Sequence, residues 1–434
     1  MAKYQKYAEY KNSGVEWLGK IPSDWKVVKL NYKLKLLSGD GITAFDIEDT
    51  GTYPVFGGNG LRGFTEQYNC DGEYALIGRQ GALCGNINVA RGKFFATEHA
   101  VVVYPYETFN LTFLSEFLRF MDLGQYSVSA AQPGIAVDRI NTLPIVIPTL
   151  GEQNAIGAFL DHETAQIDTL IAKQEKLIEL LKEKRQAVIS HAVTKGLNPD
   201  VTMKDSGVEW LGRVPEHWGI WKFSHIAPII TCGVASTPTY VDESEGMPFL
   251  SAQNIKNNKL SLHKFNHIPY ALHEQLTRYR RPERGDILVT RVGAGIGEAC
   301  IVDIDLEFSI YVSLTHIRVR PEIAHNKFIM YFFGTDYCKF LNFDGTVTGG
   351  GVGNLNVNNV VKYRIALPTI EEQKQITDYL DNYIEKQDQL IAKAESAIQL
   401  MQERRTALIS SAVTGKIDVR NWQYPNEATT ELSQ

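Results

Sequence analysis

Two long stretches of the chain place apolar residues every three or four positions. In the first stretch this spacing continues from Ile156 to Ile189, with no proline and no glycine after Gly157. Such spacing marks one face of an α-helix, and its length exceeds that of ordinary globular helices. The pattern predicts two long helices, residues 151–196 and 371–416. Their apolar positions are Ile156, Leu160, Ile167, Leu170, Ile171, Leu177, Ile178, Leu181, Val188 and Ile189 in the first, and Ile376, Leu380, Ile384, Leu390, Ile391, Ile398, Met401, Leu408 and Ile409 in the second.

Both apolar stripes have the spacing of a coiled-coil seam. Two similar seams in one chain can satisfy each other, so we expect the helices to pair within the chain in antiparallel fashion. Two alternatives remain open: a pair of core helices in one globule, and a homodimeric coiled coil. Charged clusters containing Arg185 and Arg405 interrupt the two seams at equivalent places. We interpret these clusters as solvated faces or as docking sites for a partner.

The helices belong to a longer internal repeat. Residues 148–194 recur as residues 368–414, with 23 of 47 positions identical. A second repeated segment, which we call the arm, relates residues 11–19 to residues 204–212. We predict one shared structure for the two copies of each segment, and we interpret the tryptophans of the arms as packing and docking residues. These tryptophans are Trp17, Trp25, Trp210 and Trp218.

Between the arms and the helices lie two segments without obvious similarity, the first variable domain (residues 31–147) and the second variable domain (residues 224–367). Both contain short apolar runs separated by Gly and Asn, which predict β-rich domains with short helices. Each half of the chain then consists of arm, variable domain and helix, so we predict an α+β fold with a pseudo-two-fold internal repeat. We place the domains at residues 1–150, 151–196, 197–370, 371–416 and 417–434, and we expect the C-terminal tail to lie near residues 1–12.

Polar residues in matching loops of the two variable domains are candidate ligand contacts. They are Gly58, Asn59 and Arg62 in the first domain, and Gln253, Asn254 and Lys256 in the second. Asn and Gln can pair with adenine through two hydrogen bonds, and Arg can pair with guanine, so these are the residue types that a major-groove reader uses. Amides in glycine-rich loops are also common turn formers, and this alternative remains open.

A second pair of loops places an arginine after a strand and before a turn that contains glycine. In the first domain this arginine is Arg79, which is followed by Gln80, and in the second domain it is Arg291. The glycines would let the backbone approach a ligand closely while the guanidinium meets a phosphate or a guanine edge. In the alternative interpretation, each arginine closes a salt bridge behind the turn. A glycine-rich run that ends at Asn354 is a further candidate for the same surface.

Composition limits the possible functions. The formal net charge is −6; the first variable domain has 8 basic and 12 acidic residues, and the second has 14 and 13. A nucleic-acid surface must then be a local patch, or be completed by partners. The five cysteines have no paired spacing, and the sequence contains no recognisable metal site, dinucleotide fingerprint, phosphate loop or methyltransferase motif. Membrane spans and secretory signals are also missing, so we expect a cytoplasmic protein without catalytic residues.

The arms, the Pro-Thr-x-x-Glu-Gln sequence that begins each long helix, and the two unlike domains between them resemble the specificity subunits of type I restriction-modification systems. The resemblance covers nearly the whole chain. It implies two β-rich mixed target recognition domains separated by two long antiparallel coiled-coil helices. Each domain would read one half of an asymmetric bipartite site in double-stranded DNA, and the helices would set the spacing.

The resemblance also implies partners and assigns the chemistry to them. Two methyltransferase subunits, which bind S-adenosylmethionine, would pack on the helices and arms, and restriction subunits that use ATP and Mg²⁺ would join them. The chain itself would bind no cofactor and would be a non-catalytic subunit. Two other hypotheses remain: a bifunctional methyltransferase or nuclease chain, and a scaffold that presents two ligand-binding domains without binding DNA.

Overall fold

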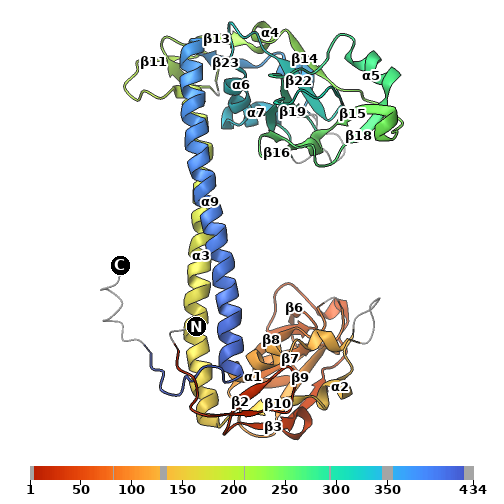
Figure 1. Ribbon diagram of the computed structural model, residues 1–434, viewed down its shortest axis with the longest axis vertical. Helices are drawn as coiled ribbons and strands as arrows, with labels where there is room; N and C mark the ends of the chain where they lie inside the picture. The colour runs from red at the N-terminus through yellow and green to blue at the C-terminus, as the bar shows by residue number, and fades with distance from the viewer. Residues whose placement is uncertain are drawn as a thin grey trace. The chain divides into compact units, whose positions relative to one another are not determined.

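The computed structural model describes residues 4–81, 83–127, 134–209, 211–292, 295–344 and 355–424. The chain divides into two compact units. The first unit comprises residues 1–175 and 395–434, and the second comprises residues 176–394. Each unit therefore contains one arm, one variable domain and a segment of both long helices (Figure 1).

The two long helices are confirmed. α3 spans Leu150–Lys195 and α9 spans Ile370–Val413. α3 begins with a capping box, because the Glu152 backbone N–H donates to Thr149 Oγ1 (3.3 Å) and the Thr149 N–H donates to Glu152 Oε2 (3.1 Å). It ends where Gly196 takes a φ of +79°, a conformation that favours glycine. Local sequence signals therefore mark both ends of this helix.

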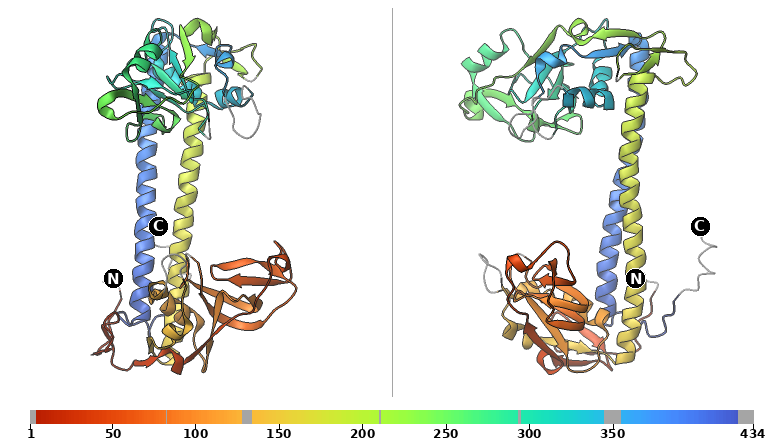
Figure 2. Two further views of the ribbon diagram at one scale, coloured as in Figure 1. Left: turned by 90° about the vertical axis from the view of Figure 1, so that its right-hand side faces the viewer. Right: turned by 180° about the vertical axis from the view of Figure 1, so that it is seen from behind.

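Within each unit a segment of α3 lies beside a segment of α9 and runs in the opposite direction (Figure 2). In the first unit Arg405 Nε donates to Asp168 Oδ1 (2.9 Å), and in the second Arg185 Nη1 donates to Asp388 Oδ1 (2.6 Å). The repeat relates these two ion pairs, since each residue of one pair lies 220 positions from its equivalent in the other. The helices therefore pair within the chain, and both arginines contribute to that pairing.

The two arms have the same structure. The first arm is the antiparallel pair of β1 (Tyr10–Asn12) and β2 (Lys20–Pro22). The second arm is the antiparallel pair of β11 (Met203–Asp205) and β12 (Arg213–Pro215). Every strand boundary and every pairing partner is shifted by 193 residues, so the repeated sequence folds in the same way twice.

A further repeated pair of strands closes each variable domain. β3 (Lys26–Lys29) pairs antiparallel with β10 (Pro144–Ile147), and β13 (Gly219–Lys222) pairs antiparallel with β23 (Arg364–Leu367). The first strand of each pair follows an arm, and the second precedes a long helix. The pairing therefore brings the two ends of each variable domain together.

The first variable domain is built on one six-stranded sheet. All neighbouring strands are antiparallel except β5 and β8, which are parallel. α1 (Leu111–Phe120) covers one face, where Val101 and Val103 join the main core, while Val102 joins a smaller core on the other face. In spatial order the strands are β4 (Leu34–Ser38), β9 (Ala100–Pro105), β7 (Cys70–Gly78), β8 (Ile87–Ala96), β5 (Tyr53–Gly57) and β6 (Gly60–Thr65).

The second variable domain has the same strand order, with the long strand β8 replaced by two short strands, β20 and β21. β15 and β21 are parallel, as β5 and β8 are in the first domain. One sheet has the order β14 (Ile229–Cys232), β22 (Leu314–Arg318), β19 (Ile287–Thr290) and β20 (Ala299–Ile301), and the other has the order β18 (Asn266–Pro269), β15 (Gly246–Leu250) and β21 (Ser309–Ile310). The second variable domain also contains β16 (Ile255–Lys256), β17 (Lys259–Leu260), α4 (Phe223–Ile226), α5 (Tyr270–Thr277), α6 (Asn326–Phe333), α7 (Asp336–Asp344) and α8 (Val357–Val360). The first variable domain also contains α2 (Val137–Asn141).

Two glycines show how closely the variable domains correspond despite their unlike sequences. Gly39 follows β4 and Gly233 follows β14. A Cβ atom on Gly39 would lie 2.0 Å from the carbonyl oxygen of Ala96, and one on Gly233 would lie 2.0 Å from that of Ile310. Both domains therefore need glycine at the same close contact between backbones, and the predicted internal repeat extends into the variable domains.

The two ends of the described chain meet within the first unit. Tyr10 Oη donates to Gly415 O (3.1 Å), and the Asp418 N–H donates to Gln5 O (2.8 Å). Ile417 is buried in the core of the first unit. These contacts join the first arm to the segment that follows α9.

Candidate nucleic-acid interface

A pocket forms where two loops of the first variable domain meet. The loops touch through their backbones: a Cβ on Gly78 would lie 2.0 Å from the carbonyl oxygen of Gly58, and a Cβ on Gly58 would lie 3.1 Å from that of Gln80. Glycine therefore allows residues that are far apart in the chain to form one surface. Four of the five residues predicted in this domain line the pocket, whose lining comprises Gly58, Asn59, Arg62, Gln80, Gly81 and His99.

The side chains of Asn59, Arg62 and Gln80 are exposed at this pocket. His99 adds an imidazole, whose Nε2 lies 3.3 Å from Glu98 Oε1. Two carboxamides, a guanidinium and an imidazole thus present hydrogen-bond donors and acceptors in one place. His99 was not predicted, because it lies in the turn between β8 and β9 and no local sequence pattern connects it with the other lining residues.

Arg79 supports the loop that carries Gln80. Its backbone N–H donates to His99 O (2.8 Å), and its carbonyl oxygen accepts from the Ile135 N–H (2.9 Å). Its guanidinium donates from Nη1 to Ser38 Oγ (3.2 Å). Among the described residues Arg79 forms no ion pair, so the salt-bridge alternative is not observed in that part of the chain.

The second variable domain repeats this backbone arrangement at Arg291. The Arg291 N–H donates to Ser313 O (2.8 Å), and its carbonyl oxygen accepts from the Leu355 N–H (2.9 Å). The guanidinium also donates from Nε to Leu355 O (2.6 Å). Arg291 therefore joins the segments that contain Ser313 and Leu355, as Arg79 joins those that contain His99 and Ile135.

Asn254 is a correction to the predicted contacts. Its side chain is only 1% exposed, and Nδ2 donates to Ser261 O (2.9 Å) and Lys264 O (3.0 Å). The amide therefore holds a turn together and is not available to a base. For Asn254 the structure thus agrees with the alternative in which the amide forms a turn. The side chains of Gln253 and Lys256 are exposed on either side of it. Burial thus changes from one residue to the next at Gln253 and Asn254, which the residue types alone do not reveal.

The docking prediction is wrong for Trp25 and Trp218. Both side chains are fully buried, at 0% exposure, so neither can contact a partner. Each indole N–H instead donates to a glutamate at the start of a long helix, Trp25 to Glu152 Oε1 (3.2 Å) and Trp218 to Glu372 Oε1 (3.1 Å). The repeated tryptophan and glutamate are thus the two ends of one contact between arm and helix.

Trp17 differs from these two tryptophans. It is 38% exposed, and its ring packs against Phe117 and Phe120 with centroid distances of 6.3 and 6.0 Å. One part of the indole therefore remains accessible to a partner. The two other predicted residues, Trp210 and Asn354, lie outside the described residues.

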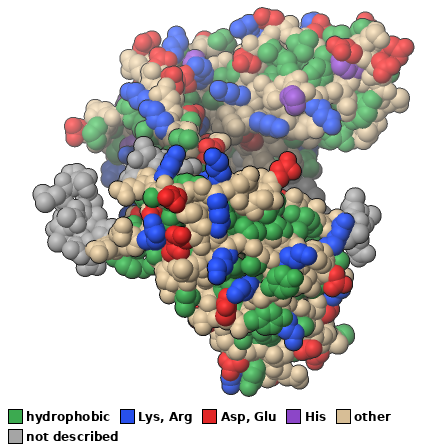
Figure 3. Space-filling view, turned by 60° about the horizontal axis from the view of Figure 1, so that its bottom comes forward, with side chains coloured by type: hydrophobic (Ala, Val, Ile, Leu, Met, Phe, Trp, Pro, Cys, Tyr) green, Lys and Arg blue, Asp and Glu red, His purple; other side chains and the backbone are tan. Residues whose placement is uncertain are grey.

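Charge is mixed over the surface. On the face drawn in Figure 3, Lys and Arg side chains are interspersed with Asp, Glu and apolar side chains. Among the residues that the structure describes, no group of three or more His, Cys, Asp or Glu side chains is placed to hold a metal ion. The search for membrane spans in the same residues finds no helix with the length and apolar character to cross a bilayer.

Comparison with known proteins identifies the family. Residues 22–180 and 215–400 match the family model described as the type I restriction modification DNA specificity domain. The two matches together cover most of the chain, and each includes one variable domain and part of a long helix. The chain belongs to this specificity family. Membership explains why both halves share one backbone arrangement, since the family domain occurs twice.

Several specificity subunits are similar in sequence to this family member. The EcoprrI specificity subunit of Escherichia coli is 43% identical over 141 residues, which are 32% of this chain and 34% of that protein. A putative specificity subunit of Haemophilus influenzae, S.HindORF215P, is 24% identical over 358 residues, 82% of this chain and 86% of that protein. Of these two relatives, the one with the higher identity matches about a third of each chain, and the one with the lower identity matches most of both chains.

Solved structures show the same fold. A chain from a study of complex assembly and conformational transition of the type I R-M system superposes with a TM-score of 0.69 at 15% identity, covering 92% of this chain and 99% of that one. The HsdS subunit of Thermoanaerobacter tengcongensis superposes with a TM-score of 0.50 at 14% identity, covering 92% and 98%. At this identity the likeness concerns the specificity-subunit fold alone.

Proposed function

We propose that this chain reads DNA sequence for a type I restriction-modification complex, with each variable domain contacting one half of a bipartite site. One observation carries the proposal: the same backbone arrangement presents different side chains at equivalent positions. The equivalent pairs are Asn59 and Gln253, Gln80 and Val292, and His99 and Ser313. Because the donors and acceptors differ within each pair, the two domains would read different bases, and the site would be asymmetric.

Direct contact with base edges fits the exposed groups of the first domain. Asn59 and Gln80 can each pair with adenine through two hydrogen bonds, and Arg62 can pair with guanine. Gly58 would allow close approach of the backbone to DNA. Arg79 and Arg291 would hold these loops in place and use their remaining N–H groups toward the DNA. Losing one two-bond contact would cost about 1 to 3 kcal/mol of discrimination at one base pair.

The helix pair would dock two methyltransferase subunits. Exposed leucines occur at positions that the repeat relates: Leu170 and Leu390 are 49% and 47% exposed, and Leu180 and Leu400 are 48% and 61% exposed. Two equivalent apolar sites suit two copies of one partner. Trp17, Arg185 and Arg405 would lie near such contacts. S-adenosylmethionine, ATP and Mg²⁺ would bind to the methyltransferase and restriction subunits, and this chain would contribute recognition without catalysis.

The mapping of methylated bases in host DNA, with and without the gene, tests the proposal directly. We expect a bipartite methylated sequence that disappears with the gene. Exchange of Asn59→Gln and Arg62→Lys should then alter the half of the sequence that the first variable domain reads and leave the other half unchanged. Arg91→Ala is the matched control, because Arg91 is exposed in the middle of β8, opposite Glu73 and away from the pocket.

Two outcomes would contradict the proposal. Methylation that does not change when the gene is removed would exclude a recognition role for the chain. Equal effects of the Asn59 and Arg91 variants on the methylated sequence would exclude the pocket as the reading surface. The purified chain should bind DNA weakly without its partners, because its net charge of −6 supplies little attraction for phosphate.

A further inference from the structure

The second variable domain contains a connection that the first lacks. In the first domain four residues, 66–69, join β6 to β7. In the second domain seventeen residues, 270–286, join the equivalent strands β18 and β19. The longer connection contains α5 and then a segment with four arginines, residues 278–284, which we call the arginine segment. This segment therefore has no counterpart in the first domain.

Two of its four arginines are neutralised by acidic partners. Arg281 forms an ion pair with Glu307, and Arg284 forms one with Asp305 (2.7 Å). Arg278 carries its positive charge without an ion-pair partner among the described residues.

The two acidic residues that follow α5 in the same connection, Glu283 and Asp286, are also paired. Arg318 lies 3.1 Å from Glu283 and 2.8 Å from Asp286, and Asp286 also accepts from His316 Nε2 at 2.7 Å. Like Arg278, Arg280 forms no ion pair within the described part of the chain. The arginine segment thus presents two uncompensated guanidinium groups.

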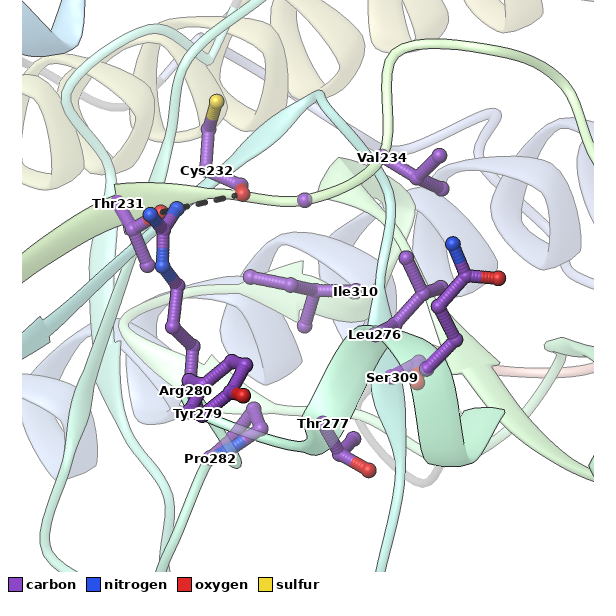
Figure 4. A pocket seen from close by; sticks show the side chains of 12 residues that line it. Thr231, Cys232, Val234, Leu276, Thr277, Tyr279, Arg280, Pro282, Ser309 and Ile310 are labelled. Atoms are coloured by element: carbon purple, nitrogen blue, oxygen red, sulfur yellow. Dashed lines mark hydrogen bonds between the residues drawn. The ribbon is translucent and has the colours of Figure 1, made fainter. Parts of the chain in front are cut away.

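Between these two arginines in the sequence lies an exposed aromatic residue. Tyr279 is 79% exposed, and the guanidinium carbon of Arg278 lies 5.3 Å from its ring centroid. On the other side Arg280 Nη1 donates to Thr231 Oγ1 (2.6 Å), which fixes its side chain along a pocket that Cys232 also lines (Figure 4).

We propose that Arg278 and Arg280, with Tyr279 between them, contact DNA phosphates and form a backbone-binding element that only the second variable domain has. The proposal rests on the proposed DNA-recognition function. Guanidinium groups bind phosphate oxygens through paired N–H donors, and a tyrosine hydroxyl can add a further donor. Such contacts position the domain on the duplex but read no sequence. They also give the second domain an attraction for DNA that compensates for the negative charge of the chain.

The test compares the salt dependence of DNA binding by the full chain purified together with the subunits that associate with it. The probes are a duplex that contains the mapped methylated site and a duplex of unrelated sequence. The variant is Arg278→Ala with Arg280→Ala, and the matched control is Arg281→Ala with Arg284→Ala, which removes two paired arginines from the same segment. Arg278→Lys with Arg280→Lys retains the charges and reports on folding.

We expect the alanine variant to bind both duplexes more weakly and to lower the slope of log affinity against log salt by about 1.8, at roughly 0.9 for each phosphate contact. Between 50 and 200 mM salt, wild type should then lose about twelve-fold more affinity than the variant. The control should keep the wild-type slope, and the lysine variant should restore most of it.

An unchanged slope in the alanine variant would overturn the proposal. So would the loss of a copurified subunit at an unchanged slope, because the arginine segment would then dock a protein. A changed base preference at an unchanged slope would make these residues base readers instead. If the proposed DNA-recognition function were wrong, wild type would bind the two duplexes with equal affinity. The salt slopes of wild type and variant could still be compared on either duplex, so the two failures can be told apart.

Discussion

Gln373 fixes the second variable domain to α9. Its side chain is fully buried, and Nε2 donates to the carbonyl oxygens of Pro368 and Ile323, both at 3.0 Å. Its Oε1 accepts from the His325 N–H at 2.7 Å, directly before α6. Gln153 takes the equivalent position at the start of α3 in the first unit. One amide thus joins the start of α9 to the segment that precedes α6.

The substitution Gln373→Glu should destabilise the second unit strongly. It keeps the shape of the side chain but replaces the Nε2 donor with an oxygen that faces two carbonyl oxygens. Two hydrogen bonds worth about 1 kcal/mol each are lost, and the buried carboxylate keeps only the His325 N–H as a donor while its other oxygen faces two carbonyl oxygens, so we expect a total cost of about 3 to 5 kcal/mol. For a unit of this size that corresponds to a fall in melting temperature of about 6 to 20 °C.

Thermal unfolding followed by tryptophan fluorescence measures the effect, because the buried Trp218 ring belongs to the same core of the second unit. Gln375→Glu is the matched control: it adds the same charge to an exposed position in the same helix turn. The difference between the two variants should shrink as the pH falls toward 5. Burial favours the protonated form of the new carboxyl group, and a protonated carboxyl can again donate to one carbonyl.

A melting temperature for Gln373→Glu within 2 °C of the control would refute the reasoning, since the buried amide would then carry little of the stability. A large difference that stays constant between pH 8 and pH 5 would refute the electrostatic explanation. In that case the cost would come from packing, and Gln373→Met should be as destabilising as the charged variant.

Three further predictions follow from single contacts. Burial raises the pKa of Asp286, but hydrogen bonds from Arg318 and other groups outweigh it and hold the pKa below its usual value. Asp286 therefore stabilises the fold above about pH 4, and this contribution is lost as the pH falls through the folded-state pKa. The substitution Asp286→Asn should lower the melting temperature at pH 7, and the melting temperature of this variant should fall less steeply on acidification than that of wild type. Gly39→Ala should prevent folding of the first variable domain, because its Cβ would lie 2.0 Å from a carbonyl oxygen, whereas Gly41→Ala, with nothing within 4 Å, should leave the circular dichroism spectrum and melting temperature unchanged. Trp17→Ala should reduce the amount of copurified methyltransferase subunit and lower the melting temperature by only a few degrees.

Much of the fold could be predicted because its signals are local or repeated. A spacing of three and four residues depends only on helix geometry, so α3 and α9 follow from the order of apolar residues, and glycine marks the end of α3 at Gly196. The arms could be recognised because one sequence occurs twice. The repeated sequence alone does not show why Trp25 and Glu152 recur. The reason is the hydrogen bond between them, which joins positions that are far apart in the chain.

The candidate interface depended on both kinds of information. The sequence by itself identified the loops, because their polar and glycine residues stand out between strands. Only the tertiary structure showed that Gln253 is exposed while its neighbour Asn254 is buried, and that His99 lies beside Gln80. These facts arise from strand order and packing, which no short segment contains.

The charges of the arginine segment also depended on both the sequence and the fold. By itself the sequence determined that four arginines lie between residues 278 and 284, and every one of them has the same charge at neutral pH. Only the fold decided that Asp305 and Glu307, on a later segment, neutralise two of them. An ion pair depends on distance in space, so the two unpaired arginines could be found only after the chain was folded.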